Sequence, residues 1–205
     1  MEDSPPSPAP KQSQPNEFWA FCLILANSAI LLVVGFALSL LFKVTPHEHL
    51  NLSLQNVAYG LLAVIPLAGF LFWFMRTDIK SFSTFRTSQI EFFANLGFRF
   101  TLVRILMISL AAGIFEEYLF RGVLQVALYP LIPVSLAILL PNIIFGLLHM
   151  RTIIYALLAG VVGTYLGLVF VVTGSLAAAM VCHTVYDIMA LEVTRRAIAA
   201  RQSKP

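Results

Sequence analysis

Long apolar runs are the feature of this sequence that most limits what it can fold into. A helix needs about 20 apolar residues to cross the ~30 Å hydrocarbon core of a bilayer. Backbone groups cannot stay unpaired in lipid, so such runs must form helices there. We therefore predict an all-α, polytopic transmembrane helix bundle. About six spanning helices are expected, over residues 18–42, 55–75, 100–128, 134–149, 152–172 and 175–194.

The composition also indicates a membrane protein. Of the 205 residues, 59% are hydrophobic and only 11% are charged, whereas about a quarter of the residues of a soluble protein are charged. The net charge is +3, but the basic residues flank the apolar runs and form no patch with interleaved aromatic residues. We therefore expect the lipid bilayer, and no nucleic acid, as a partner.

The rest of the chain divides into polar segments. Residues 1–17 contain five prolines and few hydrophobic residues, which predicts a disordered tail. Residues 18–194 are expected to form a single transmembrane domain, and residues 195–205 a basic cytoplasmic tail. Within the domain, residues 76–99 alternate charged residues with phenylalanines, which is typical of a helix lying at the membrane surface.

The lysines and arginines predict the orientation of the bundle. Cytoplasmic flanks of membrane helices are enriched in these residues. With six spans, Lys43 lies alone on one side and we expect both termini to be cytoplasmic. The basic residues on the cytoplasmic side are then Arg76, Lys80, Arg86, Arg99, Arg104, Arg151, Arg195, Arg196, Arg201 and Lys204.

Three charged residues lie within six positions of one another in the third apolar run. A charge at the centre of a membrane helix costs roughly 2.5–3.5 kcal/mol on insertion scales, and such residues are functional by default. In a helix, Glu117 and Arg121 are four residues apart and share a face, so they can form an ion pair. Glu116 is turned about 100° away from Glu117 and is left free to face a cavity.

Two further motifs carry the other polar residues within the runs. Phe145 and His149 are four residues apart in the fourth run, and His183 and Asp187 have the same spacing in the sixth. The Asp187 carboxylate can hold the His183 imidazole in one tautomer. At 1.5 Å per residue from the predicted helix ends, Glu116, His149 and His183 lie at comparable depth.

Each motif has a structural explanation when taken alone. The Glu117–Arg121 pair could lock two helices, His149 could be an interfacial histidine, and His183 could be a buried histidine with a fixed tautomer. The shared depth of the three motifs, with the cost of ionisable groups in a membrane, favours one functional site instead.

These residues could hydrolyse a peptide bond. The reaction needs water in a polar cavity, a base to activate it and donors for the tetrahedral oxygen. Zinc is the alternative means of activating water, with Glu116, His149 and His183 as ligands. The sequence has no His-Glu-x-x-His motif and glutamate-activated water needs no ion, so we favour a site without a metal or other cofactor.

The three motifs together resemble the CAAX-protease and bacteriocin-processing family of intramembrane endopeptidases. This family includes the Rce1-type prenyl-protein proteases and the Abi proteins. The strings Glu-Glu-Tyr-Leu-Phe-Arg-Gly-Val-Leu-Gln and Phe-Gly-Leu-Leu-His are also similar to its signature. The resemblance covers residues 100–190, and its motifs are Glu116-Glu117-x-x-x-Arg121, Phe145-x-x-x-His149 and His183-x-x-x-Asp187.

The resemblance implies a role for each motif residue. Glu116, together with His149, would activate a water molecule against the scissile carbonyl. Glu117 and Arg121 would orient the site, and Phe145 would line the substrate cavity.

The last motif departs from the family pattern. His183 and the residue four later would stabilise the oxyanion, and a well-known family member has asparagine at the later position. An ionised aspartate cannot donate a hydrogen bond. We therefore expect Asp187 either to orient His183 or to be protonated.

The resemblance also implies where the protein acts and on what. We expect an integral protein of a bacterial cytoplasmic (inner) membrane. Its substrate would be a membrane-anchored peptide or protein, with a prenylated, CAAX-like tail as one candidate. The alternative is a non-hydrolytic membrane protein, either a bacteriocin-immunity-type binding protein or a proton-linked transporter. Inverted repeats would favour a transporter, and we find none in the sequence.

Overall fold

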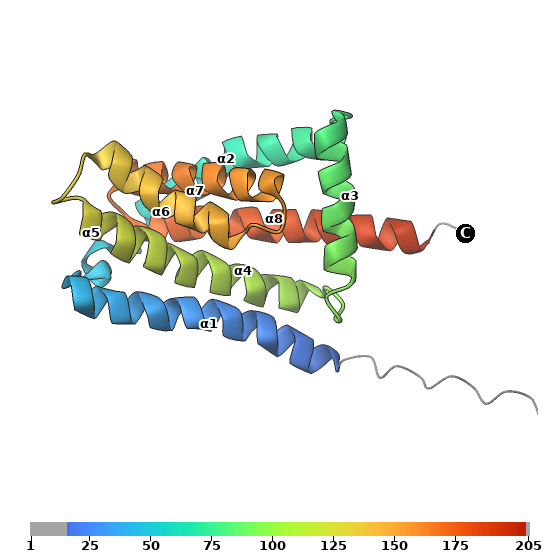
Figure 1. Ribbon diagram of the computed structural model, residues 1–205, viewed down its shortest axis with the longest axis horizontal. Helices are drawn as coiled ribbons and strands as arrows, with labels where there is room; N and C mark the ends of the chain where they lie inside the picture. The colour runs from blue at the N-terminus through green and yellow to red at the C-terminus, as the bar shows by residue number, and fades with distance from the viewer. Residues whose placement is uncertain (1–15, 204–205) are drawn as a thin grey trace, which may run out of the picture.

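A computed structural model of the chain describes residues 16–203, and all the secondary structure in this part is helical (Figure 1). Most of the predicted disordered tail, residues 1–15, and Lys204 of the predicted basic flank lie outside the described residues. The all-α prediction is confirmed for the described part of the chain.

The helices follow the predicted apolar runs closely. Bounds differ by one or two residues, except that the last helix continues past its predicted end near Thr194. The order is α1 (Glu17–Phe42), η1 (Pro46–His49), α2 (Leu54–Arg76), α3 (Lys80–Ala94), α4 (Leu102–Glu117), η2 (Tyr118–Gln125), α5 (Val126–Leu128), α6 (Val134–Leu148), α7 (Ile153–Thr173) and α8 (Leu176–Gln202).

Four helices are long and apolar enough to cross a bilayer. They are α1, α2, α7 and α8, and α6 is a shorter apolar helix. The segment α4–η2–α5 runs without a break from Leu102 to Leu128, the range of the predicted third span. The six-span count and the cytoplasmic position of both termini stay predictions.

Side-chain caps and turn residues set the helix ends. Ser53 caps α2, Thr101 caps α4 and Thr152 caps α7, each by accepting a hydrogen bond from a backbone N–H of the first turn. The N–H groups of the first turn have no acceptor within the helix, and these side chains provide one. At the other end of α7, Gly174 adopts a left-handed conformation with φ of 63°, which ends the helix.

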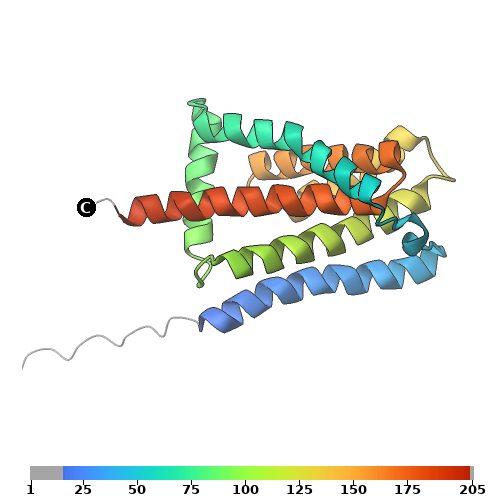
Figure 2. The same cartoon turned by 180° about the vertical axis from the view of Figure 1, so that it is seen from behind.

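The helix α3 lies across the ends of the other helices instead of along them (Figures 1 and 2). Arg86 of α3 donates to the carbonyl oxygens of Phe74, at 2.7 Å, and Thr77, at 3.2 Å, at the end of α2. Arg201 of α8 lies 3.5 Å from Glu91 of α3. The polar segment that the sequence places at the membrane surface is therefore a transverse helix fastened to two long ones.

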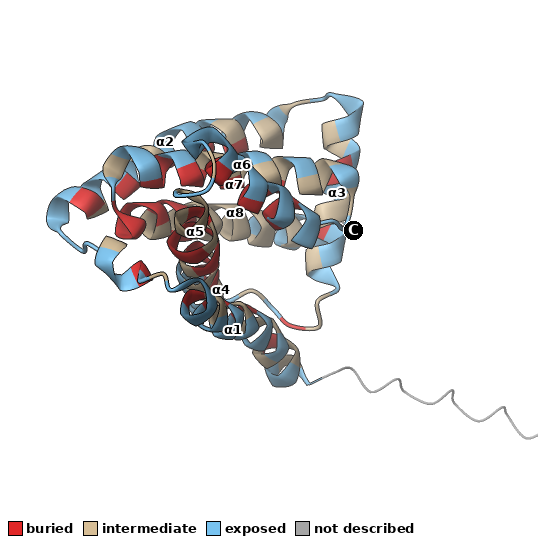
Figure 3. Ribbon diagram, turned by 60° about the vertical axis from the view of Figure 1, so that its left-hand side comes forward, coloured by how far each residue is buried: buried red, intermediate tan, exposed pale blue. Residues whose placement is uncertain are grey.

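The helix α8 is the centre of the bundle and packs against α2, α4 and α7. Its N-terminal half is buried, whereas the half that follows the site is only partly buried (Figure 3). A Cβ atom added at Gly113 of α4 would lie 2.8 Å from the Thr184 nitrogen of α8. The backbones of α4 and α8 therefore touch at this point, which only glycine allows.

Candidate active site

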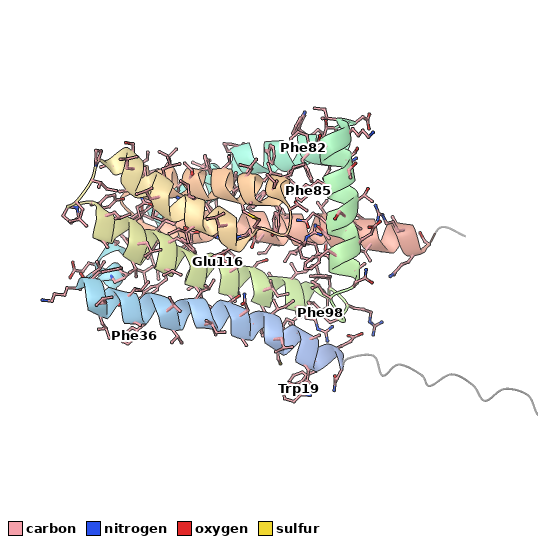
Figure 4. The ribbon with its side chains drawn as sticks, in the orientation of Figure 1. Trp19, Phe36, Phe82, Phe85, Phe98 and Glu116 are labelled. Atoms are coloured by element: carbon pink, nitrogen blue, oxygen red, sulfur yellow. The ribbon has the colours of Figure 1, made fainter. Side chains whose placement is uncertain are left out.

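The acidic pair lies where α4 passes into η2, and Figure 4 shows Glu116 on α4. The sequence predicted one α-helix over residues 100–128, but residues 118–125 form a π-helix. A π-helix closes i→i+5 hydrogen bonds and occurs often at functional sites. The wider turn carries Arg121 and Gln125, both fully buried.

Glu117 and Arg121 form a completely buried ion pair. Neither residue is exposed, and Arg121 Nη1 lies 2.8 Å from Glu117 Oε1. Arg121 Nη2 donates to Asn142 Oδ1 of α6 at 2.8 Å, and also to the Gly163 carbonyl of α7. A buried charge is tolerated when it is paired and hydrogen-bonded. The predicted pair is confirmed, and the structure links it to two more helices.

His183 connects this buried pair to the rest of the site. Its Nδ1 lies 2.8 Å from Glu117 Oε1, so Nδ1 carries the hydrogen, because an ionised carboxylate only accepts. Its Nε2 lies 3.6 Å from Asp187 Oδ2 and 4.0 Å from Glu116 Oε2. The carboxylate within hydrogen-bond distance of the imidazole is thus Glu117, whereas the sequence pattern indicated Asp187.

The exposed fraction of the side chain increases from Glu117 outwards through the residues around His183. The side chain of Glu117 is 0% exposed, that of His183 is 7%, that of Glu116 is 13% and that of Asp187 is 27%. Neighbouring residues therefore leave part of the Glu116 and Asp187 side chains uncovered, whereas Glu117 is covered completely. The two accessible carboxylates are also the two that lie beyond hydrogen-bond distance of His183.

His149 follows the last residue of α6 and lies beside Phe145. Its Nδ1 is 2.8 Å from the Phe145 carbonyl oxygen. A carbonyl can only accept, so Nδ1 carries the hydrogen, and in the neutral ring Nε2 then holds the lone pair. Among the described residues, no acidic oxygen lies within 4.0 Å of His149.

Phe145 links the two histidines through its ring. Ring centroids are 4.5 Å apart for Phe145 and His149, and 6.4 Å apart for Phe145 and His183. The Arg121 guanidinium carbon lies 5.3 Å from the centre of the same ring. Phe145 is only 4% exposed, so it packs as an inner wall of the site.

The donor set does not form a ready zinc site. Within residues 16–203, no three His, Cys, Asp or Glu side chains converge closely enough to hold one metal ion. The predicted zinc ligands Glu116, His149 and His183 therefore do not fit the ion in this arrangement.

Two buried polar residues, one that contacts the site and one beside it, were missed by the sequence reasoning. Asn142 is 1% exposed and Gln125 is fully buried. Gln125 donates to the Gly167 carbonyl of α7 at 3.2 Å. The sequence did contain a signal, because Gln125 follows Arg121 by four residues and Asn142 is a polar residue in the middle of an apolar helix, where polar groups are expensive.

Comparison with known proteins gives one finding. The model of the family described as type II CAAX prenyl endopeptidase Rce1-like matches residues 98–189, which contain all three motifs. No curated protein and no solved structure matches the chain. The matched segment begins just before α4 and ends within α8, so it includes every element that contributes a side chain to the site.

Proposed function

Because residues 98–189 match the model of the Rce1-like family of type II CAAX prenyl endopeptidases, we propose that this integral membrane protein hydrolyses a peptide bond of a membrane-anchored substrate. The observation that carries the proposal is the edge of the site. There, two partly exposed carboxylates flank His183 Nε2, Asp187 at 3.6 Å and Glu116 at 4.0 Å, beside a fully buried ion pair.

Glu116 is the general base in this proposal. Its carboxylate makes no hydrogen bond to another described residue and is accessible to water. It removes a proton as the water oxygen bonds to the scissile carbonyl carbon. When the carbon–nitrogen bond breaks, Glu116 returns this proton to the leaving amine, so its carboxylate is regenerated. His149 Nε2, with its free lone pair, holds the same water molecule.

His183 stabilises the tetrahedral oxygen in this proposal. Glu117 accepts from Nδ1, so a protonated ring directs its Nε2–H towards the site. A preorganised donor of this kind is worth most where water is excluded. Asp187, at 3.6 Å, supports the charged form of the ring and donates nothing itself while ionised. Glu117 and Arg121 are sealed from water and serve to hold His183.

The substrate in this proposal carries a membrane anchor. The bundle that holds the site contains four helices long and apolar enough to cross a bilayer, and α8, which carries His183, is one of them. A substrate held at the membrane therefore reaches the site at high effective concentration. The family description names CAAX prenyl endopeptidases, and a prenylated tail ending in Cys-a-a-X is therefore the first substrate to test.

The test compares wild-type protein with Glu116→Gln in detergent, using a farnesylated Cys-a-a-X peptide and the same peptide without its lipid. Products are identified by mass spectrometry. We expect the wild type to cleave the farnesylated peptide and Glu116→Gln to be slower by about 10²–10⁴-fold, the usual contribution of a general base. Glu48→Gln, an exposed residue of η1, is the matched control and should cleave at the wild-type rate.

Equal cleavage by wild type and Glu116→Gln would exclude Glu116 as the base. Repeating the wild-type reaction with a chelator then separates two ways of activating water: cleavage that persists supports the glutamate mechanism, and cleavage that stops supports the zinc alternative. If neither peptide is cut, membrane peptides that accumulate with Glu116→Gln in cells would identify the substrate.

A further inference from the structure

We propose that Asn142 is a positioning residue that fixes the Arg121 guanidinium and, through Glu117, the reactive imidazole of His183. The inference rests on the proposed function for its kinetic test and on geometry alone for its spectroscopic test. Asn142 lies in the middle of α6 and is 1% exposed, and among the described residues its one hydrogen bond to the site is with Arg121.

The orientation of the Asn142 amide is determined by its neighbours. Arginine has five N–H donors and no acceptor, so the atom 2.8 Å from Arg121 Nη2 must be Oδ1. The amide nitrogen then donates to the Ile138 carbonyl oxygen of the same helix at 2.7 Å. Both ends of the amide are engaged, so the side chain has one orientation that satisfies it.

The helix α7 provides a second acceptor for Arg121 Nη2. The Gly163 carbonyl also accepts from Arg121 Nη2. A Cβ atom at position 163 would lie 2.5 Å from Asn142 Oδ1 and 3.1 Å from Arg121 Nη2. Side chain and backbone from two helices thus converge on Nη2 with no spare space around it.

The rigid guanidinium transmits this constraint. Its nitrogens lie in one plane with fixed directions, so holding Nη2 at Asn142 also sets where Nη1 points. Nη1 lies 2.8 Å from Glu117 Oε1, and the same oxygen lies 2.8 Å from His183 Nδ1. Without the Asn142 amide, Nη2 keeps a single acceptor, the guanidinium can turn, and the partner of His183 Nδ1 moves with it.

Gln125 offers a matched control for a purely structural role. It is also fully buried, and it also donates across a helix interface, to the Gly167 carbonyl one turn further along α7. It forms no hydrogen bond with Arg121, Glu117 or His183 among the described residues. Gln125→Leu therefore removes a comparable interhelical bond and leaves the connection to His183 in place.

The experiment compares Asn142→Leu and Gln125→Leu in the full chain in detergent, with Asn142→Ala as a smaller substitute if leucine prevents folding. The first readout is cleavage of the farnesylated Cys-a-a-X peptide. Residues that orient a reacting group through another typically change activity by about 10–100-fold. We expect Asn142→Leu to lower kcat by this factor with KM within about twofold, because the substrate contacts are kept.

The second readout is independent of cleavage. In protein labelled with ¹⁵N-histidine, NMR reports the protonation and tautomer of the His183 ring, whose resonances are identified with His183→Gln. We expect the His183 resonances to shift in Asn142→Leu and to stay at their wild-type positions in Gln125→Leu.

The outcomes separate this proposal from the proposed function. Wild-type kcat and unshifted His183 resonances in Asn142→Leu would overturn the positioning role, as would an equal loss in Gln125→Leu. If wild-type protein cleaves no peptide but the His183 resonances shift in Asn142→Leu alone, the positioning role stands and the proposed protease function fails.

Discussion

The polar cluster of this protein has two sides that differ in how tightly they are closed. The sealed side consists of Glu117, Arg121 and Asn142, which are at most 1% exposed and joined by hydrogen bonds of 2.8 Å. On the open side, Glu116 and Asp187 are 13% and 27% exposed and lie 3.6–4.0 Å from His183.

The difference shows how a membrane protein can keep reactive groups in place. The charges on the sealed side are paired and fully buried, so they hold geometry but expose no atom to a substrate. Groups on the open side have unused lone pairs but depend on neighbours for their positions. A rigid support behind a less tightly bonded reacting layer is the arrangement that a functional site needs. Substitutions on the sealed side should therefore reduce stability most, and those on the open side should reduce it least.

The largest expected effect is from Arg121→Met. It leaves Glu117 buried without its partner, and breaking such a pair costs about 3–5 kcal/mol. The double variant Glu117→Leu with Arg121→Met should recover most of this loss, because replacing both charges by apolar groups is often neutral. The free energy of unfolding in detergent, measured by SDS titration, checks both. A double variant as unstable as the single one would show that the pair is not a closed unit.

Gly163→Ala should have the next largest effect. The new Cβ would lie 2.5 Å from Asn142 Oδ1 and 3.1 Å from a Phe145 ring carbon, and such overpacking costs about 1–3 kcal/mol. Gly69→Ala is the control, because no atom lies within 4 Å of a Cβ there. Alanine is the better helix former by about 0.5–1 kcal/mol, so this control should be slightly stabilised. Destabilisation of both variants to the same extent would contradict tight closure around Arg121.

His149→Phe should lower the free energy of unfolding by about 0.5–1.5 kcal/mol, the net worth of the lost hydrogen bond to the Phe145 carbonyl. Cleavage should fall much further, by about 10²–10⁴-fold, if the imidazole handles a proton. His49→Phe makes the same exchange in η1, where the ring packs against Phe170, and should cleave normally. Full activity of His149→Phe would remove this histidine from the mechanism.

The smallest change in stability is expected for Asp187→Asn. The carboxylate is 27% exposed and 3.6 Å from His183 Nε2, and ion pairs near solvent contribute about 0.2–1 kcal/mol. The amide adds a donor near the tetrahedral oxygen, so cleavage should stay within about tenfold of the wild-type rate. A loss as complete as that of Glu116→Gln would instead make Asp187 a second essential carboxylate.

The fold was largely predictable because its signal is local. Runs of apolar residues fix where helices lie in a membrane protein, and capping residues such as Thr101 and Thr152 fix where they begin. The ion pair of Glu117 with Arg121 was predictable for the same reason, since both residues lie on one helical segment four positions apart.

Other parts of the site depend on contacts between helices. The π-helix η2 and the choice of Glu117 over Asp187 as the close partner of His183 follow from how α4, α6 and α8 pack. The spacing of hydrophobic residues within one segment carries no information on the distances between side chains of different helices. Asn142 could have been noticed as a costly polar residue, but only the structure shows that it faces Arg121.

The contact of Gly113 with Thr184 gives α4 and α8 a point about which they can rotate. Backbones that already touch cannot move closer, and the site residues Glu116 and His183 lie within one helical turn of this crossing. If α4 and α8 part to admit an extended peptide, the motion that keeps this contact is a rotation about it. The helix ends then travel far while the carboxylate and the imidazole hardly separate, so a substrate can enter without scattering the groups that act on it.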